Sequence, residues 1–293
     1  MKVLITGSGG MLGLDMYNTF INNCDVIATD IDLNEEWLKY LDVRDYDNCH
    51  YMIKKYNPDF VLHLAALTDL EYCEKNENES WITNALGTEN IARICKKYDI
   101  TMVYISTAGV FDGKKDIYND FDEPNPLNIY GKSKYYGEKI VQNILDKYFI
   151  FRAGWMMGGM HKDKKFISQI LKQIKNGDDL NVVNDKMGNL TYTLDFSIST
   201  LKVIQTNKYG LYNQVCNGDG CSRYEIVKKM KEILKFENTI NSVNSEFFKK
   251  DYFVNRPYSE KMINLKLNHY NINYMRSWDD CLRDYLDKLN LFK

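Results

Sequence analysis

The sequence predicts an α/β protein built on a doubly wound parallel sheet, followed by a smaller, mostly helical C-terminal region. Three observations carry this prediction. Short apolar runs alternate with helix-like patterns through the first half of the 293-residue chain. A glycine-rich turn stands directly after the first apolar run. The apolar runs are nearly continuous, which suits strands that helices cover on both faces.

The predicted elements follow one another in the order that parallel βαβ units require. In the first half, strands are expected at 3–6, 26–30, 60–64, 101–106 and 148–152, with helices at 11–22, 47–56, 81–98 and 129–147. Later in the chain, helices are expected at 166–175, 195–205, 224–235 and 278–289, with one strand at 210–216. We therefore expect a first region, 1–155, which part of 190–217 joins as a further strand, and a second region, 156–293.

Composition excludes several classes of protein. Lys and Arg number 38 and Asp and Glu number 40, so a net charge of −2 gives no general attraction to nucleic acid. The longest apolar stretch, 60–67, is too short to span a bilayer, and the N-terminus lacks the features of a signal peptide. We therefore expect a cytoplasmic protein without membrane contact. Seven scattered cysteines and four distant histidines predict no metal site.

The turn between the first strand and the first helix carries a nucleotide-binding motif. It reads TGSGGMLG, which is T-G-x-x-G-x-x-G. Gly7 permits a tight turn, Gly10 lets the backbone approach a pyrophosphate, and Gly13 lets the helix pack closely on the strand. Met11 and Leu12 begin the helix, whose N-terminus stabilises phosphate charge. The sequence therefore predicts a Rossmann dinucleotide site in the first region, and this region is expected to be the dinucleotide-binding domain.

An acidic residue ends the second predicted strand. Asp30 stands 23 residues after Gly7, where a carboxylate accepts hydrogen bonds from the hydroxyls of the adenosine ribose. A carboxylate there repels a 2′-phosphate, and no Lys or Arg follows closely. NAD(H) is therefore favoured, and NADP(H) stays open as the alternative. Asp42 and Val43 are expected to flank the adenine, with a simple surface acid as the alternative for Asp42.

Three polar side chains form a candidate catalytic group. Tyr130 and Lys134 form Y-x-x-x-K near the start of a predicted helix, so their i, i+4 spacing places them on one face. An ammonium beside a phenol lowers the phenol pKa, which makes Tyr130 an acid or base near neutral pH. Lys134 can also hold a nicotinamide ribose. Thr107 follows a predicted strand at the sheet edge where ligands bind, although such a residue can also merely cap a turn.

With these motifs in view, the whole chain resembles the extended short-chain dehydrogenases/reductases and, among them, the dTDP-4-dehydrorhamnose reductases. The segments that carry the resemblance are TGSGGMLG, LHLAALTDLEYCE, ISTAGVFDG, IYGKSKYYGE, FRAGWMMGG, GLYN and NRPYSEKMINLKL. They are spread over nearly the full length. The first and fourth segments mark the superfamily, whereas the FDG, the R-x-x-W and the NRPYS segment mark the reductase branch.

The resemblance implies a function and a set of site residues. It implies an NAD(P)H-dependent reductase of the 4-keto group of a nucleotide-linked 6-deoxy sugar, with a homodimer as the expectation for the superfamily. Thr107, Tyr130 and Lys134 would be the catalytic residues, with Tyr130 as proton donor, and the backbone at Ala65 and Ala66 would pass the cofactor. The second region would form most of the substrate site. The residues implied to bind substrate are Thr68, Leu70, Thr107, Trp155 and Arg256.

The two residues that directly follow Thr107 differ from the pattern of that family. The family has Asp-Tyr, or a polar residue and then Tyr, where this chain has Ala108 and Gly109. We therefore expect a roomier and less polar pocket, and dehydration is disfavoured because the Asp-Glu pair of sugar-nucleotide dehydratases is absent. Two other functions stay open: a sugar-nucleotide epimerase of the same superfamily, and a non-catalytic dinucleotide-binding subunit like the β subunit of methionine adenosyltransferase. Trp155 as a core aromatic and Arg256 in a surface ion pair are the structural alternatives.

Overall fold

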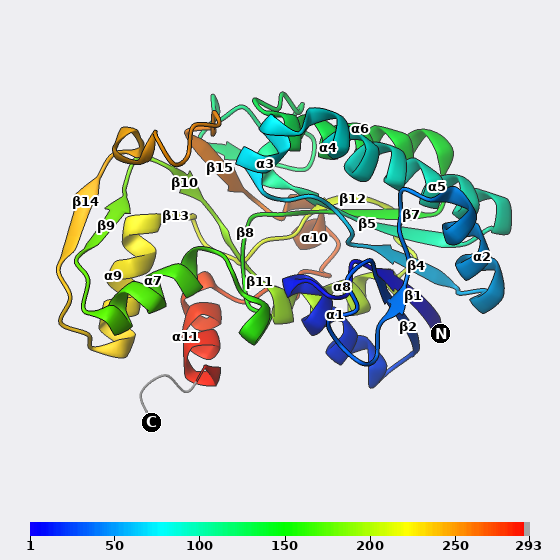
Figure 1. Ribbon diagram of the computed structural model, residues 1–293, viewed down its shortest axis with the longest axis horizontal. Helices are drawn as coiled ribbons and strands as arrows, with labels where there is room; N and C mark the ends of the chain where they lie inside the picture. The colour runs from blue at the N-terminus through cyan, green and yellow to red at the C-terminus, as the bar shows by residue number, and fades with distance from the viewer. Residues whose placement is uncertain (290–293) are drawn as a thin grey trace.

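A sheet of seven parallel strands forms the centre of the computed structural model, which describes residues 1–289 (Figure 1). Its strands are β1 (Lys2–Thr6), β2 (Asp25–Asp30), β3 (Lys39–Tyr40), β4 (Phe60–His63), β5 (Thr101–Thr107), β7 (Tyr148–Ala153) and β12 (Gly210–Asn213). They lie in the order β12-β7-β5-β4-β1-β2-β3, and every neighbouring pair is parallel. The strand order reverses beside β1, and ligands bind at the carboxyl ends of strands at such a point. The predicted fold class is confirmed.

Helices cover both faces of this sheet (Figure 1). In β1, Val3 and Ile5 face one core and Leu4 faces the other, because successive side chains of a strand point to opposite faces. Helices α1 (Met11–Ile21) and α8 (Thr193–Ile204) pack on the face of the first core, which extends further into helices of the C-terminal region. Those that complete the second core are α2 (Tyr46–Tyr56), α5 (Gly87–Tyr98) and α6 (Ile129–Ile144).

The helix expected between β4 and β5 is broken near its start. There, α4 (Glu77–Trp81) runs into a π-helical turn (Ile82–Leu86) before α5 begins. The side chain of Asn84 in this turn accepts a hydrogen bond from the Leu67 amide at 2.8 Å and donates to the Leu67 carbonyl at 3.0 Å. It also donates to the Ser133 hydroxyl of α6 at 3.0 Å. The π turn therefore fastens the segment after β4 to α6, in keeping with the frequent occurrence of such turns at functional sites.

The C-terminal region carries the expected helices and, in addition, the short helix α10 (Leu265–His269) and short strands that the sequence did not predict, one of which pairs with a strand from the first half. Besides α8 and α10, its helices are α7 (Phe166–Asn176), α9 (Arg223–Leu234) and α11 (Trp278–Lys288). The short strands form one four-stranded sheet, β13-β10-β15-β6, and two pairs, β11-β8 and β14-β9. Their bounds are β6 (Ile117–Tyr118), β8 (Trp155–Met157), β9 (Leu180–Val183), β10 (Met187–Gly188), β11 (Leu190–Tyr192), β13 (Cys221–Ser222), β14 (Ile240–Val243) and β15 (Ser259–Met262). The last four residues of the expected second region, 290–293, lie outside the described residues.

The two halves of the chain exchange strands. The strand expected after α8 is β12, and it joins the large sheet beside β7. In the other direction, β6 leaves the first half and pairs with β15, so that Lys261 lies opposite Ile117. Asp120, just after β6, holds the two halves of the chain together at this point. Its carboxylate accepts hydrogen bonds from the Asn213 amide at 2.7 Å and the Lys266 amide at 3.1 Å.

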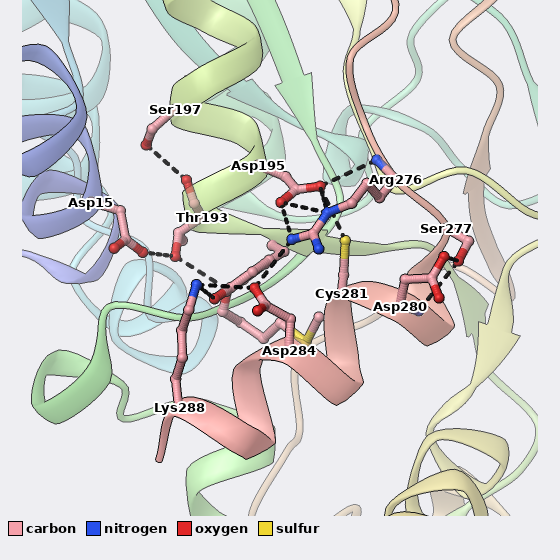
Figure 2. A network of polar contacts seen from close by, with 12 residues as sticks. Asp15, Thr193, Asp195, Ser197, Arg276, Ser277, Asp280, Cys281, Asp284 and Lys288 are labelled. Atoms are coloured by element: carbon pink, nitrogen blue, oxygen red, sulfur yellow. Dashed lines mark hydrogen bonds and ion pairs between the residues drawn. The ribbon is translucent and has the colours of Figure 1, made fainter. Parts of the chain in front are cut away.

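A polar network joins α1, α8 and α11 (Figure 2). The Arg276 guanidinium donates to the nearly buried Asp195 of α8 at 2.6 Å and to Asp284 of α11 at 3.1 Å. On the other side of α8, the Thr193 hydroxyl donates to Asp15 of α1. The first helix of the glycine motif is therefore tied, through α8, to the last helix of the chain.

Within residues 1–289, none of the helices combines the length and apolar character needed to cross a lipid bilayer. The same part of the chain brings no three His, Cys, Asp or Glu side chains together in an arrangement that could hold a metal ion. The seven cysteine thiols are free, and six of them are buried.

Candidate active site

The glycine turn lies at the carboxyl end of β1 and opens α1. Gly7 has a φ of +72°, and a Cβ on it would lie 2.5 Å from the Ala65 backbone nitrogen, so two separate constraints require glycine. A Cβ on Gly13 would overlap the Ser8 carbonyl oxygen. Beside Gly10, in contrast, the nearest atom to a Cβ would be 3.6 Å away. This combination of a tight turn, close helix packing and open space at a helix N-terminus fits a pyrophosphate cradle.

Asp30 ends β2, and its carboxylate faces the glycine turn. One oxygen accepts a hydrogen bond from the Gly9 amide at 2.9 Å, and the other accepts a hydrogen bond from the Asp32 amide at 3.0 Å. In the loop that follows, Asn34 accepts a hydrogen bond from Lys162 at 2.8 Å, and Lys162 also pairs with Glu35 at 2.7 Å. A lysine distant in sequence therefore lies beside the Asp30 loop, with its charge balanced by a carboxylate.

Other residues expected at the cofactor lie in the first turn of α1 and in the segment after β4: Met11, Leu12, Ala65 and Ala66. Two more lie after β3. Asp42 forms an ion pair with Arg44 at 2.8 Å, and this contact lowers the pKa of the Asp42 carboxyl. Val43 is buried in the core between the sheet and α2 and α5. Their contact with an adenine stays a prediction.

Thr107 and Tyr130 meet at the same edge of the sheet. Thr107 ends β5 and its hydroxyl accepts a hydrogen bond from the Gly109 amide at 3.1 Å, while Tyr130 lies in the first turn of α6, close enough for Thr107 to lower its pKa. The two segments approach closely because both have glycine at the contact: a Cβ on Gly131 would overlap the Gly109 carbonyl oxygen. Asn128 caps α6 by accepting a hydrogen bond from the Gly131 amide at 2.9 Å. These contacts fix the first turn of α6 against the end of β5.

The acidity of Tyr130 differs from the sequence-based expectation. Burial raises the pKa of its hydroxyl to about 12, and the hydrogen bond with Thr107 opposes this shift only in part. The expectation that Lys134 holds this pKa low is therefore wrong for this structure, because desolvation of a phenolate outweighs a nearby amine that is itself desolvated. At neutral pH Tyr130 is protonated, which is the state that a proton donor requires.

Lys134 lies in α6, one turn after Tyr130, and burial lowers its pKa to about 7. Its Nζ lies 4.1 Å from the centroid of the Tyr104 ring in a cation–π contact. Glu138, one turn further along α6, opposes the pKa shift of Lys134. The Glu138 carboxylate accepts a hydrogen bond from Ser106 at 2.6 Å and forms a buried ion pair with Arg152 at 2.7 Å. Through these contacts α6 is fixed to β5 and β7 directly beside the candidate catalytic residues.

On the substrate side, Trp155 is half-buried in β8, and its indole Nε1 donates to Glu260 at 2.7 Å. The Arg223 guanidinium lies over the Trp155 ring at 4.5 Å and over the Phe166 ring at 4.6 Å. Among residues 1–289, none forms a hydrogen bond or ion pair with this guanidinium. Burial raises the pKa of the Glu260 carboxyl, whereas the indole and the charges of Arg223 and Arg256 lower it. These side chains therefore form one cluster around the Glu260 carboxylate.

The other expected substrate residues lie around α3 (Leu70–Lys75). Leu70 begins this helix, and Thr68 just before it is exposed and accepts a hydrogen bond from Lys165 at 3.3 Å. Arg256 forms an ion pair with Glu71 of α3 at 2.8 Å, which is the structural alternative that the sequence left open. The ion pair brings the segment before β15 against α3.

The departure at Ala108 and Gly109 has an outcome that the sequence did not predict. The two residues begin a 3₁₀ turn (Ala108–Val110) after β5. A Glu260 carboxylate oxygen lies 3.7 Å from the position of a Gly109 Cβ, so a polar group from another strand stands close to these two residues. Strand β15 therefore places a carboxylate beside Ala108 and Gly109, which have no polar side chain of their own.

Sequence reasoning missed four residues of this neighbourhood. They are Asn84, Glu138, Arg223 and Glu260. Of these, only Glu138 carries a readable signal, since it continues the i, i+4 series of Tyr130 and Lys134 along α6. The other three act through contacts between segments that are far apart in sequence.

Comparison with known proteins shows the family and the fold of the chain. The family model described as the RmlD substrate binding domain matches residues 1–291. The chain belongs to the RmlD family. A curated relative is the spore coat polysaccharide biosynthesis protein SpsK of Bacillus subtilis, which is 30% identical over 289 residues, with 98% of this chain and 97% of SpsK covered. The dTDP-4-dehydrorhamnose reductase of Aggregatibacter actinomycetemcomitans is 29% identical over 219 residues, with 72% of each chain covered.

Solved structures of RmlD-type reductases share the whole fold. A dTDP-4-dehydrorhamnose reductase from Clostridium acetobutylicum superposes with a TM-score of 0.91 at 30% identity, with 99% of both chains covered. The reductase from Bacillus anthracis, solved in complex with NADP, gives a TM-score of 0.90 at 29% identity, with 98% of this chain and 99% of that chain covered. The UDP-glucose 4-epimerase of Thermus thermophilus, at 18% identity, shares the fold.

Proposed function

We propose that this protein is a reductase that transfers hydride from a reduced nicotinamide dinucleotide to the 4-keto group of a nucleotide-linked 6-deoxy sugar. The observation that carries the proposal is the meeting of Thr107 and Tyr130 at the sheet edge that also holds the glycine turn, where the start of α6 packs directly on the end of β5. Membership in the RmlD family and relatives named as dTDP-4-dehydrorhamnose reductases support the same substrate class.

The charges on the substrate side suit a nucleotide diphosphate. Arg223 is held between two aromatic rings and presents a guanidinium whose planar fork matches phosphate oxygens. Lys165 places a second amine close by, since its Nζ donates to the Thr68 hydroxyl at 3.3 Å and its pKa responds to the Arg223 charge. We infer that the diphosphate binds near these two cations, with Thr68 and Trp155 beside the sugar and Arg256 at the C-terminal side of the site.

The proton in this reaction comes from the protein. A bound dihydronicotinamide supplies the hydride, and the substrate carbonyl oxygen becomes an alkoxide as hydride reaches its carbon. Tyr130 donates its hydroxyl proton to that oxygen, and because burial holds its pKa near 12 the donor is loaded at neutral pH. Thr107 donates a hydrogen bond to the same oxygen and stabilises the developing charge. One hydride and one proton thus convert the ketone to an alcohol.

Lys134 is assigned two roles, one toward the charge of Tyr130 and one toward the cofactor. Its pKa of about 7 means that it gains and loses a proton near neutral pH. As an ammonium it stabilises the phenolate that Tyr130 becomes after donation, and i, i+4 spacing in α6 places the two residues on one helix face. Its buried position at the sheet edge also suits a hydrogen bond to the nicotinamide ribose.

The dinucleotide is proposed to bind across residues 1–155, with a preference for NAD(H). The Asp30 carboxylate is anchored on the glycine turn, where it accepts ribose hydroxyls and repels a 2′-phosphate. Lys162 acts against this preference, but its pairing with Glu35 offsets most of its attraction for a phosphate. The substrate would lie mainly against residues 156–293.

The test is the oxidation of NADH and NADPH, followed by absorbance, with dTDP-linked 4-keto-6-deoxy sugars. The wild-type protein should consume one reduced cofactor per sugar reduced. Tyr130→Phe removes only the donated proton and should lower kcat by roughly 10²–10⁴-fold. Tyr136→Phe is the matched control, since it deletes the hydroxyl of an exposed tyrosine in the same helix. A wild-type protein that interconverts sugars without net oxidation of cofactor would refute the proposal, and full turnover by Tyr130→Phe would refute its proton donor.

A further inference from the structure

Glu260 occupies a position that brings a carboxylate to the reacting end of the site. It lies in β15, whose neighbours in the second sheet are β10 and β6. One point in space, the position of a Cβ on Gly109, lies 3.4 Å from the Thr107 hydroxyl oxygen and 3.7 Å from Glu260 Oε1. A carboxylate oxygen and the hydroxyl proposed to hold the substrate carbonyl therefore face the same small space.

The two oxygens of Glu260 have different surroundings. Oε2 accepts the indole hydrogen of Trp155 at 2.7 Å, which fixes the side-chain orientation. Oε1 receives no hydrogen bond from any of residues 1–289, and no described cation lies within ion-pair distance of the carboxylate. A partly buried charged acceptor without a donor is costly, so a ligand that donates to it gains affinity.

Electrostatics decide which part of the substrate faces this carboxylate. A diphosphate is repelled by a carboxylate and attracted by Arg223, which is stacked on the Trp155 ring. The sugar ring is neutral and carries hydroxyl donors. Of the two parts of the substrate, the sugar ring is therefore the one that can lie against Glu260 without charge repulsion.

We propose that Glu260 is a specificity-determining residue whose Oε1 accepts a hydrogen bond from a hydroxyl of the sugar ring while Thr107 and Tyr130 hold the carbonyl oxygen. This inference rests on the proposed function, because it takes the substrate to be a nucleotide sugar. It assigns to β15 the polar contact that Ala108 and Gly109 do not provide. A site built to accept a substrate hydroxyl discriminates strongly against analogues that lack the hydroxyl.

The experiment compares the binding of dTDP and dTDP-L-rhamnose by calorimetry, which requires no turnover. Glu260→Gln keeps an oxygen for the Trp155 indole but replaces the charged acceptor at the sugar. The preference of the wild-type protein for dTDP-L-rhamnose over dTDP should fall roughly tenfold or more in this variant, because hydrogen bonds to charged groups are among the stronger ones. Affinity for dTDP itself should stay unchanged or rise. Glu232→Gln, an exposed acid of α9, is the control and should change neither affinity.

Each result decides the matter. A preference for the rhamnosyl ligand that is equal in wild type and Glu260→Gln overturns the inference, as does a wild-type protein that binds both ligands equally. An equal loss of affinity for both ligands also overturns it, because Glu260 would then support the nucleotide site as a whole. If the preference falls as expected but no keto-sugar is reduced, the reductase proposal fails while the sugar contact stands. In an active enzyme, Glu260→Gln should raise KM more than it lowers kcat.

Discussion

Replacing Glu138 by glutamine should destabilise the protein far more than the loss of an ordinary ion pair. The Glu138 and Arg152 side chains are 1% and 3% exposed, and their closest atoms lie 2.7 Å apart. Glu138→Gln keeps the shape but leaves a guanidinium buried without its counter-charge, and one Arg152 nitrogen already lacks a partner. Removing one partner of a buried pair costs about 3–5 kcal/mol. That is a large share of the roughly 5–15 kcal/mol that stabilises a typical domain.

Urea unfolding followed by circular dichroism measures this cost as a fall in the midpoint at unchanged slope. The matched control is Glu89→Gln, which breaks the exposed i, i+4 pair with Arg93 on the neighbouring helix α5 and should cost about 0.3–0.5 kcal/mol. The double variant Glu138→Met, Arg152→Met removes both charges and should recover most of the stability. The reasoning is wrong if the free energies of unfolding of Glu138→Gln and Glu89→Gln differ by less than ~1 kcal/mol, which is the usual upper value for surface ion pairs. Such a result would show that solvent reaches the pair of Glu138 and Arg152.

Three further predictions follow from the same structure. Gly7→Ala should destabilise the protein and abolish dinucleotide binding, because this position combines a positive φ with an overlap of the new Cβ and the Ala65 backbone. The control is Gly177→Ala, where φ is +78° but no atom lies within 4 Å of the new Cβ. This control should lose only the backbone penalty of about 1–2 kcal/mol in thermal or urea unfolding. Lys134 has a pKa of about 7 when folded and an ordinary value of 10.5 when unfolded, so the unfolded state binds one more proton between these values. Relative to Lys134→Met, the wild-type free energy of unfolding should therefore rise by about 1.4 kcal/mol per pH unit across that window, and parallel curves would contradict this pKa. Asp30→Ala should lower the affinity for NADH roughly tenfold while sparing NADPH, measured by fluorescence titration, and equal losses for both cofactors would argue against a ribose contact.

Six strands of the large sheet were predictable because they are buried, apolar runs, whereas the two exposed residues of β3 were not predicted. Val103 and Ile105 face one core while Met102 faces the other, so both sides of β5 are apolar and the run is easy to recognise. The short strands of the second sheet have no such signal. A strand of two residues, such as Met187–Gly188, is too short to show any periodicity, and its partners lie far away in sequence. The π turn before α5 was missed for a related reason, since it interrupts a pattern that is otherwise helical.

The site was predictable where it follows from local motifs and unpredictable where it depends on packing. The glycine turn and the spacing of Tyr130 and Lys134 are local, so the sequence places these residues at the sheet edge. The high pKa of Tyr130 depends on how deeply the folded chain buries it, which no spacing reveals. Glu260 reaches the site only because β15 pairs with strands from two other parts of the chain.

The exchange of strands between the halves has a consequence for synthesis on the ribosome. The outer edge of β7 stays open until Gly210–Asn213 has emerged, and β6 has no neighbour until Ser259–Met262 has emerged. Open strand edges promote aggregation of partly made chains. A nascent polypeptide that stops near residue 155 should therefore depend on chaperones rather than fold alone, and fragments cut at that boundary should be soluble only when both are co-expressed.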